Sequence, residues 1–125
     1  MSKVVQAVNV MIEHPEKISN AISTNEGFSV FFCYDQKHVW SIVKRANFEG
    51  DDFVLSYYPN GEATQELVNL EPENWEDLTF VRYSASDIGT KEAKQSFSEL
   101  FNIVQEKVFG MDEVFDEIIN GDIPF

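Results

Sequence analysis

Apolar residues recur at intervals of three and four near the start of the chain. The residues of this stripe are Val4, Val8, Met11, Ile12, Ile18 and Ile22. A stripe with this spacing predicts an amphipathic helix over residues 3–23. Pro15 interrupts the pattern, so we expect the helix to be kinked there or split, with a second helix starting at this proline.

A period of two residues follows the helical stripe. Residues 28–34, 38–45 and 53–58 are rich in β-branched and aromatic side chains, and short polar turns separate them. This pattern predicts three neighbouring antiparallel strands. Residues 63–70 fit either a short strand or a helical turn, and we favour the strand. Residues 77–84 are expected to form the last strand.

Helical spacing returns near Thr90 and runs almost to the end of the chain. One helix face is expected to hold Ala93, Phe97, Leu100, Phe101, Val104 and Val108. Thr90 or Asp87 can cap the start of this helix, and Gly110 is expected to end it in a left-handed conformation. A second helix follows, with an apolar stripe of Val114, Phe115, Ile118 and Ile119.

This order of elements predicts an α+β fold. We expect an N-terminal helix, an antiparallel meander sheet of four or five strands, and two C-terminal helices packed on the sheet. Both alternating sets of side chains in residues 28–34 include apolar members, so the second face of the sheet also needs a cover or a partner. No repeat or linker is visible, and residues 1–125 are expected to form a single α+β domain.

The charge of the chain is strongly negative and unevenly distributed. The 22 acidic and 9 basic residues give a formal net charge of −13. Residues 46–81 hold nine acids and residues 108–125 hold five, and neither segment contains Lys or Arg. One interpretation is a solvated surface; the other is a docking surface for a basic protein, since such a field speeds encounter. Direct binding to nucleic acid phosphates is not expected from so acidic a chain.

The remaining composition offers few groups for catalysis. Cys33 is the only cysteine, so we expect no disulfide or multi-cysteine metal site, and its aromatic strand predicts that it is buried. Asp35 and His38 flank a turn and are expected to form a surface pair. There is no phosphate loop, nucleophile elbow or dinucleotide fingerprint. We therefore expect no enzymatic activity, no cofactor and no bound metal.

Targeting signals are also absent from the pattern. No apolar run approaches the roughly 18 residues of a membrane span. The N-terminus lacks the basic and apolar regions of a signal peptide. The expectation is a cytoplasmic protein without membrane contact.

Aromatic residues lie within or beside the acidic segment 46–81. Interface cores favour Tyr and Trp, and an acidic rim suits a basic partner. The alternative is that these aromatic residues cap the core at the edge of the sheet. The predicted partner-binding residues are Asp51, Asp52, Tyr57, Tyr58, Glu71, Glu73, Trp75, Glu76 and Asp77.

In size and composition the chain is similar to small bacterial immunity proteins. That resemblance implies a non-catalytic inhibitor that neutralises a basic protein, such as a toxin or nuclease, through its acidic residues. Three alternatives stay open. They are an anti-defence protein of a mobile element that mimics nucleic acid, a homodimeric structural or chaperone-like domain, and a small-ligand binder.

Overall fold

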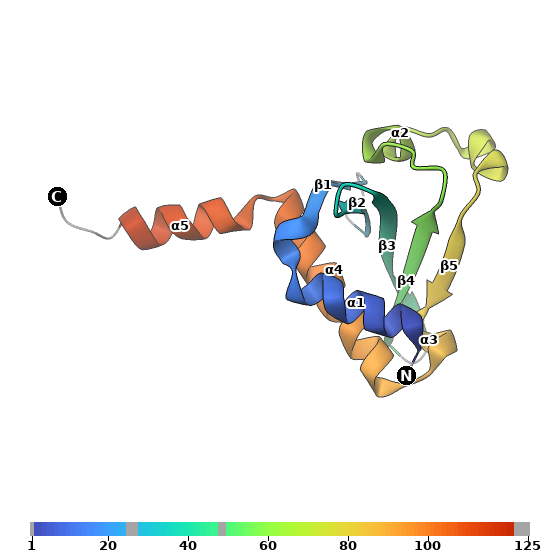
Figure 1. Ribbon diagram of the computed structural model, residues 1–125, viewed down its shortest axis with the longest axis horizontal. Coiled ribbons are helices and arrows are strands. Elements are labelled where there is room, and N and C mark those ends of the chain that lie inside the picture. Colours follow the sequence, from blue (N-terminus) through green and yellow to red (C-terminus); the bar gives the residue numbers. More distant parts are fainter. Residues whose placement is uncertain (1, 25–27, 48–49, 122–125) are drawn as a thin grey trace.

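The computed structural model of the protein describes residues 2–24, 28–47 and 50–121, with the backbone alone at Asn47, Pro72 and Asp112 (Figure 1). In chain order the elements are α1 (Lys3–Glu13), η1 (Pro15–Lys17), β1 (Ile18–Ser23), β2 (Ser29–Tyr34), β3 (His38–Asn47), β4 (Gly50–Tyr58), α2 (Thr64–Val68), η2 (Pro72–Asp77), β5 (Val81–Ser84), α3 (Ala85–Ile88), α4 (Lys91–Val108) and α5 (Met111–Gly121). The elements η1 and η2 are 3-10 helices.

The sheet is an antiparallel meander. Its five strands lie in the order β1-β2-β3-β4-β5, so every strand pairs with its neighbours in sequence. An N-terminal helix precedes the sheet and helices follow it. The predicted α+β class is therefore confirmed.

The prediction of helix over residues 3–23 is wrong in its second half. The helix ends at Glu13, and residues 18–23 form strand β1. Pro15 cannot donate a backbone hydrogen bond, and a 3-10 turn begins there. Beyond this turn the backbone of β1 pairs with β2, Ile18 opposite Tyr34. Strand pairing with a distant segment outweighs the local helical spacing.

The prediction for residues 63–84 also needs correction. The favoured strand over residues 63–70 is wrong, because Thr64–Val68 form helix α2. The last strand is shorter than predicted, Val81–Ser84, since η2 runs to Asp77. Leu67 of α2 is fully buried against the sheet. One turn of helix is therefore enough to bring this side chain into the core.

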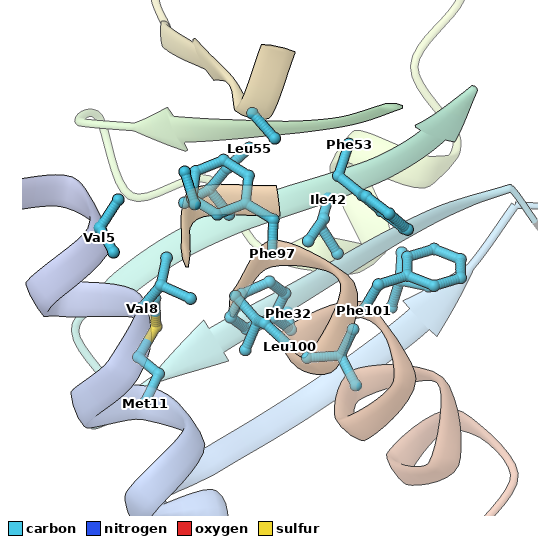
Figure 2. Packing of buried hydrophobic residues seen from close by; sticks show 14 of the residues in the cluster. Val5, Val8, Met11, Phe32, Ile42, Phe53, Leu55, Phe97, Leu100 and Phe101 are labelled. Atoms are coloured by element: carbon cyan, nitrogen blue, oxygen red, sulfur yellow. The ribbon is translucent and has the colours of Figure 1, made fainter. Parts of the chain in front are cut away.

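The main core lies between the sheet and the pair α1 and α4 (Figure 2). Helix α1 contributes Val5, Val8 and Met11. The predicted face of α4 is confirmed, and its buried members include Ala93, Phe97, Leu100, Phe101 and Val104. Thr90 caps this helix, because its side chain accepts a hydrogen bond of 3.0 Å from the Ala93 amide. Gly110 follows the helix at a φ of +61°, as its left-handed role requires.

A second apolar cluster covers the opposite face of the sheet. Its buried members are Phe31, Cys33, Val39, Tyr58 and Leu67, and side chains of α2, η2 and the segment before β5 pack on them. The sheet is thus covered on both faces, as its two apolar alternations require. Cys33 is buried as predicted, and burial raises the pKa of its thiol. A neutral, buried thiol is a poor nucleophile.

Helix α5 continues from the end of α4 after only Phe109 and Gly110. In Figure 1 it projects from the body of the protein on the side away from β5. None of the helices in residues 2–24, 28–47 and 50–121 is long and apolar enough to cross a lipid bilayer.

Candidate functional site

The predicted partner-binding residues are divided among separate parts of the molecule. Asp51 and Asp52 lie at the beginning of β4, next to the start of α3. The turn η2 lies beyond the other end of β4, since Val81, which follows η2, pairs with Tyr57. Asp51 and Tyr58 are seven positions apart on one strand, or roughly 23 Å. The acidic residues at the start of β4 and those of η2 therefore lie in two separate parts of the surface.

Asp52 is a structural residue. Its side chain is only 3 % exposed. The carboxylate accepts hydrogen bonds from the amides of Phe53 (2.9 Å) and Ser86 (3.0 Å) and from the hydroxyls of Ser84 (3.1 Å) and Ser86 (2.9 Å), and Arg45 lies 3.3 Å away. These bonds tie β4 to the end of β5 and to the first turn of α3. A partner cannot reach this carboxylate in the folded protein.

The surroundings of Asp52 act on its pKa in opposite directions. Burial raises the pKa, and hydrogen bonds from Ser86, Ser84 and Phe53 lower it. The hydrogen bonds prevail, so the pKa of Asp52 lies below its ordinary value. The carboxylate is thus ionised at neutral pH, where it accepts all of these bonds.

Asp51 is exposed but already has a partner. Its carboxylate lies 3.5 Å from the Lys44 ammonium, on the neighbouring strand. Both side chains are about half exposed, so the pair adds little stability. It does reduce the negative potential at this end of the sheet.

The two adjacent tyrosines point to opposite faces of the sheet. Tyr57 lies on the helix side, where its hydroxyl shares a 3.1 Å hydrogen bond with His38 and its ring packs 4.8 Å from that of Trp40. His38 and Asp35 both lie exposed at the turn between β2 and β3, as predicted, but the hydrogen-bond partner of His38 is Tyr57. Tyr58 is buried on the other side, bonded to Ser41 at 2.8 Å, and burial raises the pKa of its hydroxyl.

Residues 71–77, here called the acidic turn, present a cluster of exposed negative charge. Their exposed carboxylates are Glu71, Glu73, Glu76 and Asp77. Trp75 is half-buried, and its ring lies 6.2 Å from that of Phe31 in the second cluster. Trp75 thus caps the core and holds the acidic turn on the sheet. Backbone hydrogen bonds from Asn74 to Glu71 (2.9 Å) and from Leu78 to Trp75 (3.2 Å) close the turn.

A cavity of about 360 Å³ lies beside the acidic turn on the same face of the sheet. Its polar lining includes Ser41, Ser56, the Tyr58 hydroxyl and Arg82, and its apolar lining includes Phe31, Trp75 and Phe80. The Arg82 guanidinium lies 5.2 Å from the centre of the Phe80 ring. Sequence reasoning missed this site. The sequence does contain a sign of the cavity, because Ser41, Ser56 and Arg82 are polar residues within apolar strands. Strand pairing places Ser56 between Ser41 and Arg82.

The second acidic segment lies far from the acidic turn. Glu113, Asp116 and Glu117 are exposed on α5. Figure 1 places α5 at one end of the long axis and the coil of η2, beside α2, towards the other. The two acidic segments of the sequence therefore do not form one continuous surface.

The acidic turn and the cavity present carboxylate, hydroxyl, guanidinium and aromatic groups. Within the part of the chain that the structure describes, no three His, Cys, Asp or Glu side chains are grouped to hold a metal ion. Comparison with protein families, with curated proteins and with solved structures finds no match to this chain. The functional argument therefore rests on the geometry of the acidic turn and of the cavity.

Proposed function

We propose that the protein is a non-catalytic binding protein that neutralises a basic protein partner, such as a toxin or nuclease, through its acidic turn. The observation that supports this function is the group of four exposed carboxylates within residues 71–77, a segment without any base. An immunity protein that inhibits such a toxin is the corresponding biological role.

The acidic turn has two properties that favour binding. Trp75 and the closing backbone bonds hold it in place, so little conformational entropy is lost when a partner docks. Its carboxylates create a concentrated negative field that steers a basic protein towards this edge. Each exposed ion pair contributes only about 0.2–1 kcal/mol, so the field acts mainly on the association rate.

We expect charge reversal in the acidic turn to slow association. In the variant Glu71→Lys, Glu73→Lys, Glu76→Lys, the association rate constant for a basic partner captured from source cells should fall at least tenfold at low salt. Surface plasmon resonance with the purified partner measures this rate. The matched control reverses three exposed acids elsewhere, Glu13→Lys, Glu99→Lys and Glu106→Lys, and so changes the net charge equally.

The control distinguishes an effect of the charges in the acidic turn from an effect of the net charge of the protein. A large effect of the acidic-turn variant with a small effect of the control supports the proposal. Equal rates for the two variants would show that only total charge matters. An unchanged rate in the first variant would remove the acidic turn from the interface.

The cavity supports a second candidate function, binding of a small aromatic carboxylate. Arg82 and the serine hydroxyls suit a carboxylate, and Phe31, Trp75 and Phe80 suit a ring.

At tenfold excess over its dissociation constant such a ligand stabilises the fold by about 1.4 kcal/mol. We expect benzoate-type compounds to raise the melting temperature of the wild type and of Lys94→Gln, and not of Arg82→Gln. A rise that survives Arg82→Gln would exclude this site.

A further inference from the structure

Helix α5 presents an apolar face to solvent. Its residues Val114, Phe115, Ile118 and Ile119 are 37 %, 45 %, 60 % and 66 % exposed. The other side of the helix is acidic, and α5 contains no Lys or Arg. An isolated helix of 11 residues is marginal in water, so burial of this face is needed to stabilise it.

An apolar groove of about 460 Å³ lies on the helix side of the sheet, between α1 and β5. Trp40, Tyr57, Val81 and Tyr83 of the sheet line it, together with Ala7 and Val10 of α1. Helix α4 packs over β1 to β4 with α1 beside it, and the groove residues Val81 and Tyr83 of β5 stay exposed. The helical layer thus leaves part of this face of the sheet uncovered.

We propose that α5 of one copy docks in this groove of a second copy, and that the exchange is reciprocal and forms a dimer. The groove of the same chain is out of reach. Only Phe109 and Gly110 join α4 to α5, and two residues span at most about 7 Å. Figure 1 shows that α5 then runs away from β5, whose Val81 and Tyr83 line the groove.

Charge complementarity favours a second copy as the occupant. Among the residues that the structure describes, no acidic side chain lines the groove. His38 lines it, and Lys3 lines an adjoining hollow that shares Ala7, Trp40 and Tyr83 with it. The Lys3 ammonium beside the groove suits the carboxylates that flank the apolar face of α5. Reciprocal docking buries two α5 helices in two grooves, so the interface is twice that of a single docked helix.

The mass of the protein in solution tests the proposal. Sedimentation equilibrium of the full chain at tens of micromolar should give twice 14.3 kDa. Ile118→Asp on α5 and Val81→Asp in the groove should each raise the dimer dissociation constant at least tenfold, and any loss of helical circular dichroism should not exceed the 11 residues of α5. The matched control is Phe28→Asp, because Phe28 is 57 % exposed and lies outside the groove, and it should stay dimeric.

Mixing Ile118→Asp with Val81→Asp tests whether α5 of one copy docks in the groove of the other. The α5 of Val81→Asp can still dock in the groove of Ile118→Asp, so an equimolar mixture should form a mixed dimer through one intact contact. A monomeric wild type, a dimer that survives Val81→Asp, or a mixture that stays monomeric would each overturn the proposal. The charge-reversed acidic turn should remain dimeric, so this result is independent of the proposed partner binding.

Discussion

Replacing Asp52 with alanine is expected to lower the free energy of unfolding by about 3–5 kcal/mol. The carboxylate accepts five hydrogen bonds, from the amides of Phe53 and Ser86, from the hydroxyls of Ser84 and Ser86, and from the Arg45 guanidinium. Alanine leaves these donors without their acceptor, and the Ser84 hydroxyl is buried where water cannot readily replace it. Urea denaturation measures the loss of stability.

The neighbouring residue supplies the control for this prediction. Asp51 is exposed and makes one surface ion pair, so Asp51→Ala should cost less than about 1 kcal/mol. Similar losses for the two variants would contradict the structural role of Asp52. A folded, stable Asp52→Ala would make Asp52 available again as a partner-binding residue.

The pH dependence of stability provides a second readout of the same site. The pKa of Asp52 is lower in the folded protein than its ordinary value of 3.8. Its stabilising effect is therefore present above about pH 4 and is lost as the pH falls through the lower, folded pKa. Asp52→Asn cannot titrate, so its stability should fall less steeply than that of the wild type below pH 4.

Replacing Phe97 with alanine is expected to destabilise the fold by about 3–5 kcal/mol. Phe97 is fully buried in the main core between α4, α1 and the sheet (Figure 2). The cavity left by the lost ring cannot fully collapse, because helices and strands surround it. Denaturant unfolding at one fixed protein concentration measures the effect.

A second phenylalanine at the end of the same helix serves as the control. Phe109 is 67 % exposed, so Phe109→Ala should change stability by no more than about 0.5 kcal/mol. A loss at Phe97 no larger than the loss at Phe109 would contradict the position of α4 on the sheet.

The acidic residues have different roles in different parts of the fold, so the net charge of the protein does not belong to a single surface. Asp52 stabilises the fold, Asp51 pairs with Lys44, the acidic turn faces solvent, and the acids of α5 accompany an exposed apolar face. A single acidic surface formed by both segments would require η2 and α5 to be adjacent. They lie apart, so the proposed partner binding and the proposed self-association use different surfaces (Figure 1).

Local periodicity determined much of the fold. The alternation in residues 28–34 and 38–45 predicted paired strands, because side chains of a strand point to opposite faces in turn. The spacing of residues 93–104 predicted the buried face of α4, and the capping roles of Thr90 and Gly110 followed from local backbone chemistry. These features depend on residues within a few positions of one another.

Tertiary structure decided what local spacing left ambiguous. Residues 18–23 have apolar residues at helical spacing, but pairing with β2 makes them a strand. Asp52 has the composition of a surface residue, and only the approach of Ser84 and Ser86, more than 30 positions away, makes it buried. The cavity and the groove likewise combine side chains from several strands and helices. Contacts between distant segments leave no local pattern in the chain, so only the folded arrangement reveals them.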